Sequence, residues 1–261
     1  MIEPHLNLHG YATNGTSTFG SGRSAKYTRF GYDLSKTDRP FTTTTSGLTT
    51  SNKASNLKTI SFSSQLSAST WRLPSNADVS KPVVFEAIGA GGYGANGDPG
   101  NLGAGGGGGG AYAKITISNA SLNDVFAITV PISVIATAQD AVVTRNSQAF
   151  LLAKGGASAS TITGGAGGAS ASCVGDVAYS GGNASNTVGL LGGTGGASAN
   201  ATGNGANASG GTAGVATGIG GNGGSRDTAG SSPGGGAGGS SDSGTAKAGG
   251  TGLVTITYYE F

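Results

Sequence analysis

The stretch GGYGANGDPGNLGAGGGGGGAY, residues 91–112, decides how this chain folds. Glycine recurs in it at every third position, as Gly91, Gly94, Gly97, Gly100, Gly103, Gly106 and Gly109. Three residues per turn is the period of the polyproline II conformation, which makes no hydrogen bonds within its own segment. Such segments pack against each other only where a residue without a side chain faces the neighbouring backbone. The spacing therefore predicts ordered, packed polyglycine II-type segments with these seven structural glycines at the contacts.

Glycine is concentrated in the second half of the chain. Of 53 glycines among 261 residues, thirty-four follow residue 150, and Tyr179 is the only aromatic residue between Lys154 and Leu253. So little apolar area does not fold a segment of this length by side-chain burial. We prefer a stack of short polyglycine-type segments joined by polar turns. A flexible glycine–serine linker and a collagen triple helix are the alternatives, and the seven prolines are few for collagen.

The rest of the chain after residue 57 has the period-two pattern of strands, and no stretch has the pattern of an amphipathic helix. The expected strands lie in 57–66, 82–90, 111–118, 125–133, 148–155 and 253–261. The terminal strand, LVTITYYEF, must pair to cover its apolar face, and residues 83–88 or 111–118 are its expected partners. The fold class is therefore all-β: a glycine-rich, β-sandwich-like domain over residues 58–261, with the packed polyglycine II-type segments inside it.

Residues 1–57 differ in composition and are expected to form an extended N-terminal attachment arm and linker. Residues 1–60 carry a net charge of +4 and six aromatic residues before residue 45, more than a disordered tail usually has. The polar stretch 42–56 is typical of a linker. Aromatic and basic side chains without a core of their own indicate docking onto a partner. The candidate attachment residues are Arg23, Lys26, Arg29, Phe30, Tyr32 and Arg39.

The sequence gives little material for catalysis, so we expect no enzyme, no cofactor and no metal site. His5 and His9 are the only histidines and Cys173 is the only cysteine. The match of residues 89–94, GAGGYG, to a dinucleotide-binding fingerprint is weak, because a glycine tract follows it instead of a helix. The net charge of +2 does not indicate nucleic-acid binding. The first residues lack the pattern of a signal peptide, and no apolar run is long enough for membrane insertion.

The order of these motifs resembles the glycine-rich domain of bacteriophage tail fibre and tail-tip proteins, over residues 58–261. The resemblance is carried by TWRLP (70–74), VVFEAIGAGGYG (83–94), GAGGGGGGAYAKITIS (103–118) and GTGLVTITYYEF (250–261). The chain departs from that family in the alanine and serine content of its glycine half, and in lacking proline before Leu253.

The resemblance implies a virion structural protein, assembled in the host cytoplasm and located in the phage tail. Within that class we expect a tail fibre or tail-tip protein that binds a host receptor. The alternative is a virion protein without adhesive function, such as a head fibre, decoration or tail-completion subunit. The expected partners are other virion proteins, tail or portal-proximal, a host cell-surface receptor and two further copies of the chain, because fibres of this kind are usually homotrimers.

Charged residues interrupt the glycine half in a few places, and charges do not fit inside a packed glycine array. They are therefore expected at loop tips, where binding specificity is often located on a rigid scaffold. Keeping the turns soluble is an equally good explanation for them. The candidate receptor-facing residues are Tyr93, Arg226, Asp227, Asp242 and Lys247.

Overall fold

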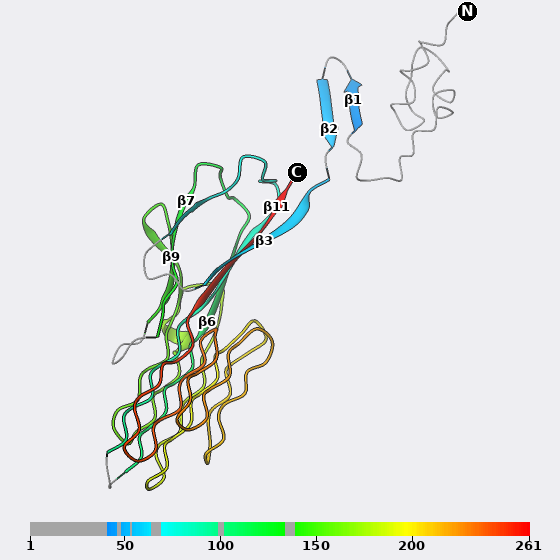
Figure 1. The fold of residues 1–261 in the computed structure, drawn as a ribbon. Coiled ribbons are helices and arrows are strands. Elements are labelled where there is room, and N and C mark those ends of the chain that lie inside the picture. The colour runs from blue at the N-terminus through cyan, green and yellow to red at the C-terminus, as the bar shows by residue number, and fades with distance from the viewer. Residues whose placement is uncertain (1–40, 46–47, 53, 64–68, 99–101, 134–138) are drawn as a thin grey trace, which may run out of the picture. The chain divides into compact units, whose positions relative to one another are not determined.

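The computed structural model describes residues 41–45, 48–52, 54–63, 69–98, 102–133 and 139–261 (Figure 1). Two compact units, residues 1–56 with the last two residues and residues 57–259, are described separately. In the first unit, β1 (Phe41–Thr45) and β2 (Leu48–Asn52) form an antiparallel hairpin. Paired strands therefore occupy most of the stretch 42–56, which was expected to be a linker. The β-branched threonines that fill this stretch favour paired strands, although they make it polar.

Two antiparallel sheets make up the strand part of the second unit. The five-stranded sheet has the order β10-β6-β5-β11-β3, and the four-stranded sheet has the order β4-β7-β8-β9. The strands of the first sheet are β3 (Asn56–Ser63), β5 (Val83–Ile88), β6 (Tyr112–Ile117), β10 (Val177–Tyr179) and β11 (Leu253–Glu260). Those of the second are β4 (Ser69–Arg72), β7 (Val125–Thr129), β8 (Ala141–Arg145) and β9 (Gln148–Ala153). The one helical turn in the described residues is η3 (Ser170–Ser172), so the all-β prediction is confirmed.

The C-terminal strand β11 lies in the interior of the five-stranded sheet. It pairs antiparallel with β5, with Leu253 opposite Ile88, and β3 flanks its other edge. This confirms the predicted pairing of the last strand with residues 83–88. Val254 and Ile256 on one face of β11 are fully buried, as the alternation of apolar and polar residues in its sequence requires.

Aromatic rings from both sheets form the centre of a common core. Phe85 of β5 packs on Phe126 of β7, with ring centroids 4.7 Å apart, and on Phe150 of β9 at 5.3 Å. Trp71 of β4 contacts Tyr258 of β11, with centroids 5.6 Å apart. Residues from the two sheets thus belong to one apolar cluster, which holds the sheets together.

The glycine half forms an array of twelve segments that belong to no long strand or helix, here called the glycine lattice. These segments are 89–98, 102–111, 154–161, 163–168, 180–187, 191–199, 204–209, 212–217, 220–225, 228–231, 234–241 and 244–252. Successive segments run in opposite directions. Figure 1 shows them side by side below β6, where they continue the strands of the sheets.

Three inner segments organise the glycine lattice: 102–111, 191–199 and 234–241. Within the described residues, each of them hydrogen-bonds through its backbone to the other two and to four of the nine outer segments. For segment 102–111, the six bonded neighbours are 89–98, 154–161, 163–168, 180–187, 191–199 and 234–241. Most residues of the inner segments, including Gly103 to Ala111, are buried. The core of the lattice thus consists mainly of backbone, with small side chains such as those of Ala104 and Ala197.

The hydrogen bonds of an inner segment repeat every three residues. Gly105 and Gly108 donate to segment 154–161, at 2.9 Å each. The amides that follow them, of Gly106 and Gly109, donate to segment 180–187. Ala104, Gly107 and Gly110 donate to segment 234–241. Residues three apart along the segment therefore face the same neighbour, and the three sets of such residues face three different neighbours. This explains why the spacing of three dominates the sequence.

The run of seven glycines spans two antiparallel segments of the lattice. Its first three members lie in segment 89–98 and its last three in segment 102–111, and Gly100 lies outside the described residues. A Cβ atom on any of the first three would lie 2.1–2.2 Å from a carbonyl oxygen of segment 234–241. On any of the last three it would lie 1.9–2.5 Å from a backbone atom of segment 191–199. The six described glycines therefore stand where two backbones touch.

Asparagine side chains complete the hydrogen bonding of the outer segments. The amides of Gly164 and Gly167 each donate to an asparagine Oδ1, of Asn186 and Asn183, at 2.9 Å. The same contact recurs for Asn96, Asn204, Asn207 and Asn222. An outer segment has fewer neighbouring backbones than an inner one, so these side chains supply the missing acceptors.

Candidate functional site

The alternation of the twelve segments places every second turn of the lattice at the same end, away from the sheets. The turns at this end, here called the distal end, are formed by Asp98 with Leu102, 161–163, 187–191, 209–212, 225–228 and 241–244. The opposite end joins β5, β6, β9 and β11 directly. The distal turns are thus held at fixed positions on a scaffold of bonded backbone, which is a common arrangement for a binding surface.

Exposed apolar side chains gather in three distal turns. Val188, Leu190 and Leu191 have exposed fractions of 62%, 51% and 48%, and Leu102 and Ile162 are also exposed. The three turns are bonded to each other: the amide that follows Leu102 donates to the 187–191 turn at 2.9 Å, and that turn donates to the Ile162 carbonyl at 3.1 Å. We call these five residues the distal apolar patch. Composition alone did not reveal it, because Leu102 and Ile162 are far in the sequence from Val188, Leu190 and Leu191.

Arg226 and Asp227 lie at the distal end, as predicted, in the turn 225–228. Both side chains bond to neighbouring segments. The Arg226 Nε donates to the carbonyl of Gly192 at 2.9 Å, and the carboxylate of Asp227 accepts from the amide and the hydroxyl of Ser241 at 2.8 and 2.7 Å. These charges therefore stabilise the distal turns from within.

The other sequence-derived candidates lie apart from each other. Asp242 is exposed in the distal turn 241–244. Lys247 lies within segment 244–252 rather than at a turn, because its carbonyl accepts from Gly94 in the lattice. The prediction of a loop tip at Lys247 is therefore wrong. The candidate attachment residues Arg23, Lys26, Arg29, Phe30, Tyr32 and Arg39 lie outside the described residues, as do His5 and His9.

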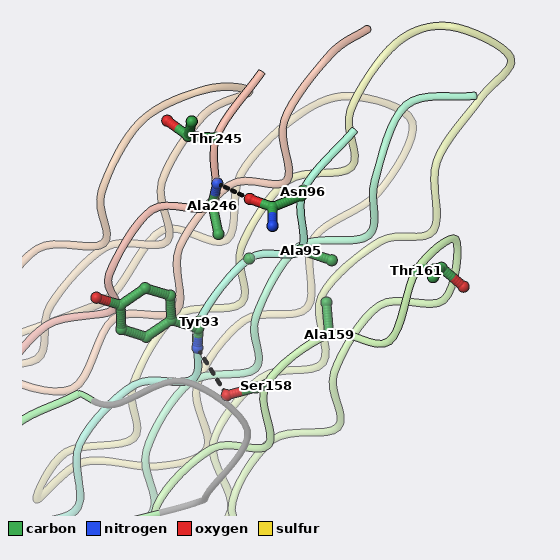
Figure 2. A pocket seen from close by; sticks show the side chains of 9 residues that line it. Tyr93, Ala95, Asn96, Ser158, Ala159, Thr161, Thr245 and Ala246 are labelled. Atoms are coloured by element: carbon green, nitrogen blue, oxygen red, sulfur yellow. Dashed lines mark hydrogen bonds between the residues drawn. The ribbon is translucent and has the colours of Figure 1, made fainter. Parts of the chain in front are cut away.

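Tyr93 lies on the flank of the lattice, beside a groove of about 490 Å³ between three outer segments. The groove is lined by Tyr93, Gly94, Ala95, Asn96, Ser158, Ala159, Thr161, Thr245 and Ala246. Figure 2 shows the Tyr93 ring and three alanines along its length. The position of Tyr93 follows from the period of three. Gly91 and Gly94 face segment 234–241, and Gly92 faces segment 154–161. The third face of segment 89–98 is therefore left to Ala90, Tyr93 and Asn96.

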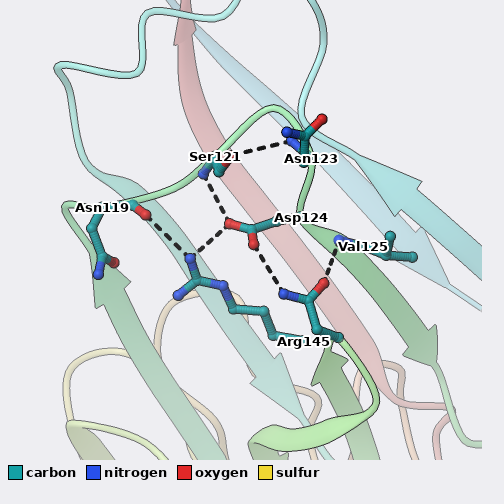
Figure 3. Close-up of polar contacts among 7 residues, drawn as sticks. Asn119, Ser121, Asn123, Asp124, Val125 and Arg145 are labelled. Carbon is teal, nitrogen blue, oxygen red and sulfur yellow. Dashed lines mark hydrogen bonds and ion pairs between the residues drawn. The ribbon is translucent and has the colours of Figure 1, made fainter.

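A polar cluster around Asp124, at the start of β7, is fully bonded (Figure 3). Its carboxylate accepts from Arg145 at 2.7 Å, from the amide of Ser121 at 2.9 Å and from Asn146 at 3.1 Å. Burial of Asp124 opposes its ionisation, but these hydrogen bonds outweigh burial, so the pKa of the carboxyl lies below its usual value. The cluster fixes the connection before β7, and both carboxylate oxygens already accept hydrogen bonds within the fold.

Two other titratable groups lie near the junction of the sheets and the lattice. The hydroxyl of buried Tyr112 donates to Glu86, and burial together with this bond raises the pKa of Tyr112. Burial also raises the pKa of the half-buried Cys173 thiol, which packs against the core. Neither group has the features of a reactive site. Within the residues that the structure describes, no His, Cys, Asp and Glu side chains cluster as in a metal site. Nor is any described helix long and apolar enough to cross a membrane.

Neither a protein-family model nor a curated protein sequence matches the chain.

Proposed function

We propose that this chain is a bacteriophage virion protein, a tail fibre or tail-tip protein that binds a receptor on the host cell. The observation that carries the proposal is the distal end, where the turns of the lattice present the distal apolar patch to solvent. Large apolar patches on the surface of a soluble protein often mark interaction sites. The order of motifs in the sequence, which resembles phage tail proteins, supplies the class.

The glycine lattice suits this role because its segments are rigid and most of their residues have small side chains or none. We propose that they are polyglycine II-type helices, consistent with hydrogen-bond partners that change at each residue and repeat every three. A lattice bonded in this way keeps the distal turns in place without needing apolar side chains inside it. The turns are then free to differ in sequence, and binding specificity resides in them.

We further propose that residues 1–57 attach the protein to other virion proteins and that the assembly is a homotrimer in the phage tail, formed in the host cytoplasm. The net charge and the aromatic residues of the N-terminal segment support a docking role. The trimer rests on the resemblance to phage fibres. Light scattering of the purified chain measures its mass, and a monomer would contradict the trimer.

The test of receptor binding is a cell-binding assay with the purified, fluorescently labelled full chain on a panel of bacterial strains. We expect saturable binding to the host strain. The double substitution Leu190→Ser and Leu191→Ser should reduce it by at least about tenfold, since two apolar contacts of this size contribute more than the 1.4 kcal/mol that a factor of ten requires. The matched control is Val215→Ser, an exposed apolar residue at 64% on a lattice segment away from the distal apolar patch.

The alternative function is a virion protein without a receptor. It predicts that the chain is incorporated into particles, that the labelled chain binds no strain in the panel, and that the Leu190/Leu191 variant leaves infectivity unchanged. Equal loss of cell binding with Val215→Ser would also contradict a receptor site at the distal end.

A further inference from the structure

We propose that the groove beside Tyr93, here called the flank groove, binds an uncharged carbohydrate. This inference deepens the proposed attachment role and rests on it for its biological meaning, because host surfaces display sugars. None of the five residues of the distal apolar patch lines the flank groove, which shares only Thr161 with the distal turns.

The flank groove is built by three outer segments that are bonded to each other. Segment 154–161 donates to the carbonyls of Ala90 and Tyr93, at 2.8 Å each. On the other side, the amide of Ala246 donates to the Asn96 Oδ1 at 2.6 Å. Figure 2 shows both sides, with Ser158 bonded to the amide of Tyr93. Because backbone bonds fix all three segments, the groove is formed before any ligand binds.

The floor and wall of the flank groove offer an aromatic ring and small apolar residues. Tyr93 is half-buried, so its ring is held by the lattice and still reaches solvent. Ala95, Ala159 and Ala246 lie along the groove and leave room beside the ring. The face of an aromatic ring is electron-rich and attracts the weakly positive C–H groups on the flat face of a sugar ring. This is the contact that an uncharged sugar needs in order to bind from water.

Polar groups on the rim are able to bind hydroxyl groups. The Asn96 Oδ1 is occupied by Ala246, but within the described residues its amide nitrogen has no protein partner. The hydroxyls of Thr161 and Thr245 are likewise without a partner among the described residues, and the hydroxyl of Ser158 accepts one bond and keeps its own proton to donate. Amides and hydroxyls that donate and accept match the hydroxyls of a sugar.

The uncharged lining and the volume of the flank groove restrict the class of ligand further. None of the lining residues is charged, so nothing in the flank groove compensates a phosphate, a sulfate or a carboxylate. The volume of about 490 Å³ lies within the ordinary range of small-ligand sites and accommodates one or two sugar rings. The structure therefore favours a neutral mono- or disaccharide unit, such as a hexose or an N-acetylhexosamine, over an anionic sugar.

The test uses the full chain and a set of defined sugars: methyl hexopyranosides, methyl N-acetylhexosaminides, their disaccharides and glucuronic acid. Saturation-transfer NMR and calorimetric titration measure binding. We expect at least one neutral sugar to bind, and glucuronic acid to bind more weakly. Tyr93→Ala should weaken the neutral sugar by at least about tenfold, whereas Tyr93→Phe, which keeps the ring, should change its affinity by less than about threefold.

A second variant guards against misfolding of Tyr93→Ala. Thr245→Val changes one exposed rim hydroxyl without enlarging the side chain and should weaken the same sugar. Val215→Ser is the control and should leave sugar binding unchanged. The inference is overturned if the wild-type chain binds no neutral sugar, or if Tyr93→Ala and Thr245→Val, shown to be folded by Trp71 fluorescence, bind as the wild type does.

Cell binding separates this inference from the proposed function. If cells are bound through Leu190 and Leu191 but no sugar is bound, the flank groove has no carbohydrate role and the attachment proposal stands. If a sugar is bound with the expected dependence on Tyr93 but no cells are bound, the carbohydrate site stands and the attachment proposal fails.

Discussion

The substitution Gly109→Ala tests whether close backbone contact holds the glycine lattice together. Gly109 is buried in the inner segment 102–111. A Cβ atom there would lie 1.9 Å from the carbonyl oxygen of Ala197 and 2.3 Å from its carbon, whereas ordinary contacts begin near 3.4 Å. Both obstructing atoms belong to the backbone, so no side chain is able to rotate away. The two inner segments would have to move apart by more than an ångström.

The energetic cost follows from the bonds that such a separation breaks. Segment 191–199 is bonded to segment 102–111 on both sides of Gly109, by Gly196 to Gly107 at 3.1 Å and by Ala199 to Gly110 at 2.9 Å. A buried backbone group left without its partner costs about 1–3 kcal/mol. Losing both bonds should lower the free energy of unfolding by about 2–6 kcal/mol. That is a large part of the roughly 5–15 kcal/mol that stabilises an ordinary domain.

Gly210→Ala is the matched control. Gly210 lies in the distal turn 209–212, its φ is +56°, and a Cβ atom there would meet nothing within 4 Å. This substitution costs only the left-handed conformation, about 1–2 kcal/mol. Chemical denaturation followed by the fluorescence of Trp71, the only tryptophan, gives the free energy of unfolding of the sheets. Amide hydrogen exchange at Gly107, Gly182 and Ala197 reports on the lattice itself.

A destabilisation by Gly109→Ala no larger than that by Gly210→Ala would refute this reasoning. So would fast exchange of amides throughout the inner segments of the wild-type chain. Either result would mean that the backbone contacts contribute little and that the lattice is held by something else.

Three further changes have expected outcomes. Asp124→Asn should lower the free energy of unfolding at pH 7 by about 1–3 kcal/mol through the loss of the charged bond to Arg145. The pKa of Asp124 is lowered in the fold, so the stabilisation by its carboxylate is complete above the ordinary carboxyl pKa and is lost as the pH falls through the lower folded value. Denaturation of the wild type and of Asp124→Asn across acid pH checks this. Deleting residues 253–261 removes a strand from the interior of the sheet and should leave insoluble protein, so soluble, protease-resistant material would contradict the role given to β11. Phe30→Ser with Tyr32→Ser should release the protein from the virion without changing its unfolding; particles that keep a full complement of the variant would place the attachment elsewhere.

The strands were largely predictable because their signal is local. Alternation of apolar and polar residues identified β3, β5, β6, β7, β9 and β11, together with the pairing of β11 and β5. No strand was predicted at β4, β8 or β10. β10 has only three residues, and its partner β6 lies sixty residues earlier in the sequence, so it depends on a tertiary contact. The polar hairpin β1–β2 has the composition of a linker, since threonine fits both strands and loops.

Close backbone contacts at the glycines could be expected from the sequence, but the arrangement of the segments could not. Glycine at every third position indicates a contact between two backbones, but the spacing does not identify the neighbouring segment. The same run of seven glycines faces segment 234–241 before the turn and segment 191–199 after it. The spacing of the asparagines is a second signal of which segments are neighbours. Asn183 and Asn186 are three residues apart, and both accept hydrogen bonds from segment 163–168.

The distal apolar patch could not be read from the sequence, for a physical reason that also bears on function. In a fold built by side-chain burial, aliphatic residues lie inside, and Leu190 or Val188 would be assigned to a core. In the lattice most inner positions are glycines at which a Cβ atom would meet a neighbouring backbone, and the buried others hold small residues such as Ala197 and Ser240, so large side chains are left on the flanks and at the turns. The outer segments need small residues and asparagines at regular positions in order to bond their neighbours. Large apolar side chains therefore destabilise the lattice least when they lie in the distal turns. Binding surfaces on this scaffold are therefore expected at the distal end, and a flank position such as Tyr93 contributes only where the third register happens to face solvent.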